Sequence, residues 1–361
     1  MTREVHLTTP TSDGWRLRLF YYPAATKKQA ETPVIICHGL AGNRLSVDFG
    51  EYESEEWNKY SLAAYLSRGG IEKDLSFDVW VVELRGRGDP PTFSPNEHPE
   101  KYKWCVDDYI DKDIPTIIRY IQNQYHKDKK PVYWIGKSMG GMIAYAYGET
   151  PAGRRNLKGV VTLGSPTRFK QKPLLLNILT RLCPRRLSIP FNAAEILREL
   201  PELRDRFIEL GASKGNIDPN ILEVYIDKGM DNTISSRVLN HFSIFFRHHT
   251  FCRYPSYPWF YDILDKIPYL PNVFKPYSYT ENLSNFISPL LAMGGGADTV
   301  APLSDIQYTT SRVGSSDVTM IILSRDNGYR TDYGHIDLTL GLHVREEVYP
   351  IIYDWLTRRE V

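Results

Sequence analysis

Short apolar runs alternate along most of the chain with amphipathic segments of helix length. The runs occupy residues 34–37, 79–82, 132–135, 160–163, 289–293 and 318–323. Runs of this kind are typical of strands that are covered on both faces, because neither face then needs polar side chains. Strands that alternate with helices in this way predict an α/β fold with a doubly wound, mostly parallel sheet.

Both ends of the chain carry patterns of their own. Residues 5–9 alternate between apolar and polar side chains, and an Asp13-Gly14 pair separates them from the run at 15–22. A turn pair between two such runs predicts a β-hairpin. Near the carboxyl end, apolar residues recur at helical spacing over 344–355, and we expect Pro350 to bend or restart that helix.

A long stretch interrupts the alternation of strands and helices. Residues 167–287 contain helical patterns at 194–211 and 235–246 but no convincing strand. We therefore predict a single α/β core made of residues 1–166 and 288–361. Residues 167–287 are expected to be inserted into it as a helical cap or lid.

Two segments inside this insertion have an unusual composition. From Phe251 to Tyr279 the chain holds ten aromatic residues and five prolines, which predicts an ordered, packed loop rather than a helix or a solvated linker. Between Arg168 and Pro190 it holds six basic residues and no acidic residue around an apolar run. Such a segment can dock on an anionic membrane or lipid surface, or it can be a solvated basic helix with its apolar stripe on the core.

The overall composition excludes several classes of protein. The 361 residues include 44 Lys and Arg against 43 Asp and Glu, so the net charge of +1 gives no general attraction to nucleic acid. No apolar run approaches the roughly 18 residues that span a bilayer, and the segment from Met1 to Pro10 lacks the apolar core of a secretory signal. We therefore expect a cytoplasmic protein with no nucleic-acid partner, and the oligomeric state stays open.

The cysteines give no sign of a metal site or a disulfide. Cys37, Cys105, Cys183 and Cys252 lie far apart and form no C-x-x-C pair. This spacing argues against a disulfide framework and against a zinc site, and it favours buried thiols. We expect neither a metal nor a cofactor.

The clearest chemical signal is the sequence Gly-Lys-Ser-Met-Gly at residues 136–140, a G-x-S-x-G motif. It follows the apolar run at 132–135 and precedes a helix-like segment, which is the context of strand, turn and helix that this motif requires. The glycines leave room for a tight turn that raises the Ser138 hydroxyl above the sheet. We predict that Ser138 is a nucleophile.

A serine hydroxyl needs a base and an orienting acid to act as a nucleophile at neutral pH. Asp298 follows a buried run and three glycines, and His335 lies between the last apolar run and the last predicted helix. These positions give the order Ser138, Asp298, His335, which is that of one known type of triad. Asp332 and Asp337 compete for the acid role because they are close to His335 in sequence, but such close neighbours seldom face each other across a loop.

Acyl transfer also needs two backbone N–H donors for the carbonyl oxygen that becomes negatively charged. One donor is expected from Met139, the residue after the nucleophile, and the other from Leu40, in the loop after the first parallel strand. We expect His38, in the same loop, to shape the turn rather than to transfer a proton.

Together these motifs resemble those of the α/β-hydrolase superfamily of serine hydrolases, over the whole predicted core. They are His-Gly-Leu at 38–40, Gly-Lys-Ser-Met-Gly-Gly at 136–141, Gly-Gly-Ala-Asp at 295–298 and Gly-His-Ile-Asp at 334–337. Further motifs, at 11–14, 78–80, 85–86 and 113–115, make the chain similar to the acid lipase and esterase branch. It is more distantly similar to polyhydroxyalkanoate synthases, which usually carry cysteine as the nucleophile.

The resemblance implies an ester hydrolase with a lid over an acyl pocket. Acid lipases often carry Gly-His-Ser-Gln-Gly, whereas this chain has Lys137 and Met139 at the variable positions. The predicted reaction is cleavage of a carboxylic ester with a lipid-like or apolar acyl group, through an acyl-enzyme on Ser138. The alternative is an acyltransferase or thioesterase with the same acyl-enzyme. Trp259 and Phe260 are candidates for substrate binding, although the aromatic residues around them can instead pack the cap onto the core.

Overall fold

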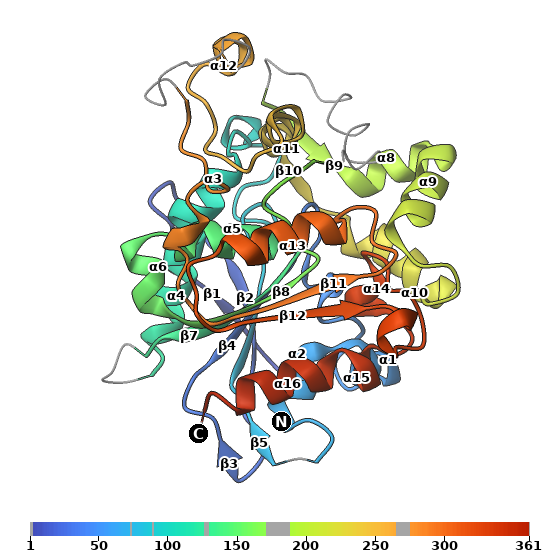
Figure 1. The fold of residues 1–361 in the computed structure, drawn as a ribbon. Helices are drawn as coiled ribbons and strands as arrows, with labels where there is room; N and C mark the ends of the chain where they lie inside the picture. The colour runs from blue at the N-terminus through green and yellow to red at the C-terminus, as the bar shows by residue number, and fades with distance from the viewer. Residues whose placement is uncertain are drawn as a thin grey trace.

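The computed structural model describes residues 3–72, 74–88, 90–125, 130–170, 188–264 and 275–360. An eight-stranded sheet passes through the centre of the molecule in the order β1-β2-β6-β4-β7-β8-β11-β12 (Figure 1). Its strands are β1 (Glu4–Leu7), β2 (Arg18–Tyr22), β4 (Val34–Cys37), β6 (Val79–Val82), β7 (Val132–Lys137), β8 (Leu157–Leu163), β11 (Leu290–Gly295) and β12 (Val318–Leu323). Neighbouring strands from β6 to β12 are parallel, whereas β2 is antiparallel to both β1 and β6. The predicted mostly parallel sheet is confirmed.

Helices cover both faces of this sheet (Figure 1). One face carries α4 (Ile114–Gln122), α5 (Met139–Gly148), α6 (Pro151–Asn156) and α13 (Leu303–Arg312). The other carries α1 (Glu55–Tyr60), α2 (Leu62–Ser67), α15 (Val344–Glu347) and α16 (Tyr349–Thr357). Every residue of the central strands β4, β6, β7 and β11 is buried. Cover on both faces explains why these runs are apolar throughout.

The two ends of the chain form the predicted hairpin and the predicted broken helix. β1 pairs with β2, although both strands are shorter than expected. In the turn between them Gly14 has a φ of 94°, a conformation that glycine adopts without strain. At the other end α15 stops at Glu347 and α16 begins at Tyr349, so that Pro350 lies in a new first turn, where a missing N–H costs nothing.

The described part of the insertion is mainly helical. It contains α8 (Ala193–Glu199), α9 (Pro201–Gly211), α10 (Pro219–Val224), α11 (Ser236–His248) and α12 (Pro258–Leu264). Its short strands β9 (Pro190–Asn192) and β10 (Thr233–Ser235) pair antiparallel, so the expectation of no strand there is wrong. Strands of three residues are too short to show alternation in the sequence. The bounds of the cap at residues 167 and 287 stay a prediction.

The aromatic segment from Phe251 to Tyr279 differs from the packed loop that its composition predicts. It contains the helix α12, which begins at Pro258, because proline is tolerated in a first helical turn. Its side chains are only partly packed: Phe251, Tyr261 and Tyr279 are buried, while Tyr257, Trp259 and Ile263 are more than half exposed. Residues 265–274 lie outside the described part of the chain.

Two smaller predictions can be compared with the described residues. Cys37, Cys105 and Cys252 are buried free thiols, as expected, and Cys183 lies outside the described residues. Among the helices that the structure describes, none has both the length and the apolar character needed to cross a bilayer.

Candidate active site

Ser138 occupies a sharp turn between the end of β7 and the start of α5. Its backbone has φ 52° and ψ −119°, an unfavourable region for a residue with a side chain. The flanking glycines make this turn possible. A Cβ on Gly136 would lie 2.3 Å from the Gly141 nitrogen, and one on Gly140 would lie 2.6 Å from the carbonyl oxygen of His38. The turn thus sets Ser138 at the carboxyl edge of the sheet.

His335 and Asp298 meet at the same edge of the sheet. The His335 Nδ1 atom lies 2.7 Å from Oδ2 of Asp298. The other carboxylate oxygen of Asp298 accepts hydrogen bonds from the backbone N–H groups of Val300, at 2.9 Å, and Ala301, at 2.7 Å. A carboxylate held in this way accepts a hydrogen bond from the Nδ1–H group, and this assigns the tautomer in which Nε2 carries no proton and can accept one.

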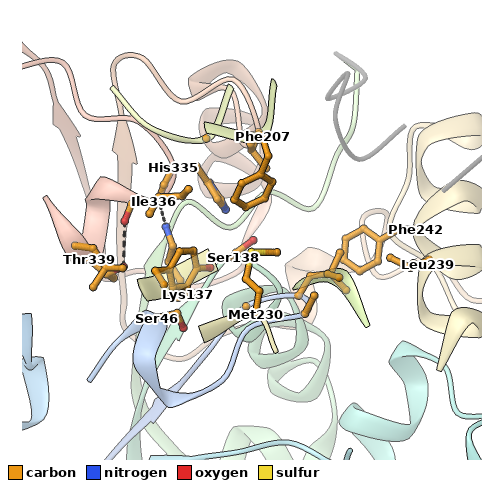
Figure 2. A pocket seen from close by; sticks show the side chains of 18 of the residues that line it. Ser46, Lys137, Ser138, Phe207, Met230, Leu239, Phe242, His335, Ile336 and Thr339 are labelled. Atoms are coloured by element: carbon orange, nitrogen blue, oxygen red, sulfur yellow. Dashed lines mark hydrogen bonds between the residues drawn. The ribbon is translucent and has the colours of Figure 1, made fainter. Parts of the chain in front are cut away.

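The His335 ring points toward Ser138 across a shared cavity (Figure 2). Burial lowers the pKa of His335 below its ordinary value, while the nearby Asp298 carboxylate acts in the opposite direction. The imidazole is therefore neutral at neutral pH. A neutral ring beside a serine hydroxyl can take up its proton.

The two competing carboxylates hold the loop rather than the imidazole. Asp337 accepts hydrogen bonds from Gly334 N at 2.9 Å, Asn216 Nδ2 at 2.7 Å and Ser213 N at 3.2 Å. Asp332 accepts one from the Arg325 N–H group at 3.0 Å. The structure thus brings Asp298 to the ring, and Asp337 ties the His335 loop to the segment that follows α9.

The loop that carries Leu40 lies against Ser138. A Cβ on Gly39 would lie 3.0 Å from that of Ser138, and Leu40 lines the cavity. The His38 ring donates from Nδ1 to the Gly39 carbonyl at 2.9 Å and accepts at Nε2 from Leu84 N at 3.2 Å. Burial holds the pKa of His38 well below its ordinary value. A neutral His38 with both nitrogens engaged shapes this turn.

Met139 is the first residue of α5, so its N–H group belongs to the helix end that has no intrahelical acceptor. Leu40 and Met139 approach Ser138 from two different strands, since one follows β4 and the other follows β7. Two backbone N–H groups arranged in this way could stabilise an oxyanion.

The cavity has a mainly apolar wall (Figure 2). The insertion supplies much of that wall, through Phe191, Phe207, Tyr225, Met230, Leu239 and Phe242. The core supplies Val300, Ile336 and Leu340 from the other side. The sequence predicted helical patterns over 194–211 and 235–246, which include Phe207, Leu239 and Phe242, but it could not indicate that these side chains meet over Ser138.

The structure does not bring Trp259 and Phe260 to this cavity. Both lie on α12, are 66% and 41% exposed, and are absent from the lining of the cavity. Figure 1 shows α12 far from the carboxyl ends of β7 and β11. An aromatic cluster in the sequence indicates apolar surface, and it does not say which way that surface faces.

Lys137 is a further residue of the site, and the sequence marked it only as a departure from the acid lipase pattern. It lines the cavity, and its side chain is almost fully buried. Its Nζ donates a hydrogen bond to the backbone carbonyl of His335 (Figure 2). Burial lowers the pKa of Lys137 to about 8, although Asp298 and Asp337 favour its charged form.

One cluster of potential metal ligands occurs among the described residues, formed by Cys105, Asp107 and His241. The His241 ring already uses both nitrogens. Nε2 donates to the Cys252 carbonyl at 2.9 Å, and Nδ1 accepts from Val106 N at 3.3 Å. We therefore assign no metal to this cluster.

Comparisons with known proteins agree with this architecture. The family model described as "alpha/beta hydrolase fold" matches residues 32–315. The Arabidopsis thaliana protein "Triacylglycerol lipase 1" is 24% identical over 94% of this chain and 83% of its own length.

Solved structures with the same fold include a soluble variant of monoglyceride lipase from Saccharomyces cerevisiae. It has a TM-score of 0.59 and 15% identity, over 99% of this chain and 95% of that one. The esterase EaEST from Exiguobacterium antarcticum has a TM-score of 0.60 and 14% identity, over 97% and 98% of the two chains. The resemblance to lipase-like and esterase-like α/β hydrolases is confirmed, and the chain belongs to the α/β-hydrolase fold family.

Proposed function

We propose that this protein is a serine hydrolase that cleaves carboxylic esters through an acyl-enzyme on Ser138. The observation that carries the proposal is the hydrogen bond between His335 and Asp298 in the wall of the cavity that contains Ser138. The family match and the lipase-like and esterase-like neighbours support the same class of reaction.

In the first half of the reaction, Nε2 of His335 takes the proton of the Ser138 hydroxyl as its oxygen attacks the ester carbonyl carbon. The carbonyl oxygen becomes negatively charged and is bound by the N–H groups of Leu40 and Met139. The bond to the alcohol oxygen then breaks, and His335 returns its proton to that oxygen. The products of this half are a free alcohol and an acyl group on Ser138.

In the second half, water replaces the alcohol. His335 removes a proton from water as the water oxygen attacks the acyl carbon, and the proton then passes to Ser138 when the acyl bond breaks. Asp298 orients the imidazole and stabilises the imidazolium that forms in each half. The free acid leaves, and the enzyme returns to its starting state.

The apolar cavity favours an ester with a lipid-like acyl group. Phe191, Phe207 and Phe242 offer a wall that gains free energy when an alkyl chain leaves water, at about 0.8 kcal/mol per buried methylene. The similar Arabidopsis protein is a triacylglycerol lipase and the yeast structural neighbour is a monoglyceride lipase, which supports the same kind of substrate.

A panel of p-nitrophenyl esters of increasing acyl length tests this function. We expect hydrolysis that improves with acyl length and is lost in folded Ser138→Ala protein. The same panel with added acceptor alcohols separates hydrolysis from the acyltransferase alternative, because transfer would give a new ester in place of the free acid. Equal rates for wild-type and folded Ser138→Ala protein would contradict the proposal.

Docking on an anionic lipid surface is a separate part of the proposal. It concerns the basic segment from Arg168 to Pro190, of which residues 171–187 lie outside the described part of the chain. Arg168 itself is held by Asp305 at 2.9 Å. Sedimentation with anionic vesicles at low salt, and release as salt rises, is the expected result. If the protein does not sediment with anionic vesicles at any salt concentration, the basic segment is not a lipid-binding surface.

A further inference from the structure

Lys137 connects the nucleophile turn to the loop of the proposed base. It is the last residue of β7 and directly precedes Ser138, so its backbone position is fixed by the same strand that positions the serine. Its side chain extends along the cavity wall to the backbone carbonyl of His335 (Figure 2). A lysine that is only 5% exposed is unusual, because burial of an ammonium group is costly unless partners offset it.

Other contacts hold the residues around His335 but do not replace this one. Gly334 N donates to Asp337 at 2.9 Å, and Ile336 N donates to the Gly211 carbonyl at 2.7 Å. Both hydrogen bonds are made by the residues on either side of His335 and not by His335 itself. The hydrogen bond from Lys137 acts on His335 itself, and it comes from the strand that carries Ser138.

The charged groups that face His335 come from three elements. Lys137 comes from β7, Asp298 from the loop after β11, and Asp337 from α14 (Asp337–Leu340). On the cap side, α9 contributes the uncharged residues Phe207 and Gly211 to the cavity. The two carboxylates favour the imidazolium form of His335, and the ammonium group of Lys137 opposes it.

We propose that Lys137 is a positioning residue for the base, which fixes the His335 loop through its backbone carbonyl and opposes protonation of the His335 ring with its positive charge. This inference rests on the proposed function, since it assigns Lys137 a role only if His335 activates Ser138. Its effect is to keep the imidazole neutral, and thus able to accept the serine proton, further into the acidic range.

The ionisation of Lys137 sets the range over which this effect operates. With a pKa lowered to about 8 by burial, Lys137 is charged below that pH and loses its proton above it. Its positive charge, which opposes the imidazolium form of His335, is therefore mostly present in neutral solution and fully present in acidic solution. In alkaline solution Lys137 is a neutral amine, which can still donate a hydrogen bond to the His335 carbonyl but no longer carries a charge.

The test is the pH profile of kcat/KM for a soluble short-chain ester, from about pH 5 to about pH 9, with kcat and KM measured separately. Lys137→Met removes the charge and the donor, whereas Lys137→Gln removes the charge and keeps a donor. Lys130→Met is the matched control. Lys130 precedes the same strand, pairs with Glu31 at 3.0 Å, and lies roughly 20 Å from Lys137 along β7.

In Lys137→Met and Lys137→Gln we expect the acidic limb of the kcat/KM profile to move to higher pH. The positive charge that disfavours the imidazolium is gone, so His335 is protonated more easily. We also expect the plateau kcat of Lys137→Met to fall by roughly tenfold, with little change in KM, because a loosened loop misplaces the base. Lys130→Met should leave both unchanged. A purely structural role would lower kcat without moving the limb, and an unmoved limb in either folded variant overturns the proposal.

The same measurements separate this inference from the proposed function. If wild-type protein hydrolyses no ester and Ser138 resists a fluorophosphonate probe, the proposed function fails and the role of Lys137 fails with it. If wild-type protein is active and the limb is unmoved in the variants, only the role of Lys137 is overturned.

Discussion

Nδ1 of His335 lies 2.7 Å from Oδ2 of Asp298, although 37 positions separate the two residues in the chain. They meet because β11 and β12 are parallel neighbours, so the loops that follow these strands emerge at the same edge of the sheet. Ser138 reaches that edge from β7, two strands away. The arrangement thus follows from the topology of the sheet and from where three loops begin.

Asp298→Asn should lower kcat by about 10³- to 10⁴-fold while the protein stays folded. An amide at this position donates to Nδ1 or accepts weakly, so it no longer selects the tautomer in which Nε2 can accept the serine proton. Steady-state kinetics with a short-chain ester measures the change. Asp332→Asn, in the His335 loop but bound to Arg325, is the control and should keep its activity. Similar losses in both variants would argue against Asp298 as the orienting acid.

Wild-type activity should fall as pH drops, with half of it left at a pH below the ordinary histidine value of about 6.5. Burial lowers the pKa of His335, so protonation of the folded enzyme requires more acidic solution than protonation of a free imidazole. The acidic limb of kcat/KM reports this group in the free enzyme. A half-activity point above the ordinary value would contradict the buried, neutral base.

Phe242→Ala should shift the acyl-length preference toward longer or bulkier acyl groups. Phe242 is 3% exposed and lines the cavity, so its truncation opens space in the cavity that contains Ser138. Each extra methylene that this space buries is worth about 0.8 kcal/mol, or roughly fourfold in kcat/KM. Trp259→Ala, an aromatic substitution on the exposed α12, should leave the preference unchanged. A shifted preference in Trp259→Ala with an unchanged preference in Phe242→Ala would indicate that the acyl group binds against α12.

Glu149→Gln should remove a loss of stability that the wild type shows as pH rises. Glu149 caps α5 and accepts a hydrogen bond from the Tyr277 hydroxyl at 2.9 Å, and burial raises the pKa of its carboxyl group to about 8. Between its ordinary pKa and 8 the folded state holds a proton that the unfolded chain has released, so the free energy of unfolding falls over that range. Thermal melting at about pH 5 and about pH 9 compares the two proteins. If the difference in melting temperature between the wild type and Glu149→Gln is the same at both pH values, the raised pKa of Glu149 is contradicted.

The sequence predicted the strands and the three triad candidates because local patterns determine them. The runs 34–37 and 79–82 coincide with the whole of β4 and β6, since cover on both faces excludes polar side chains. The turn at Ser138 was recognisable because close backbone contacts require glycine at Gly136 and Gly140.

The residues that the sequence did not reveal depend on contacts between distant segments. Phe191 and Phe242 line the cavity only because the insertion folds back over β7, and β9 pairs with β10 across about forty residues. Lys137 reaches the site through a hydrogen bond to the carbonyl of His335, 198 positions away. Composition alone predicted a substrate role for Trp259, which the structure places on an exposed helix.

Covalent labelling of Ser138 tests the acyl-enzyme most directly. Protein treated with a fluorophosphonate and analysed by intact mass and peptide mapping should carry one adduct, on Ser138, and should lose its ester hydrolysis in step with labelling. Ser138→Ala should gain no adduct, whereas Ser311→Ala, a change on the exposed surface of α13, should label like the wild type. Active wild-type protein that gains no adduct at Ser138, or that gains it without losing activity, would contradict the mechanism.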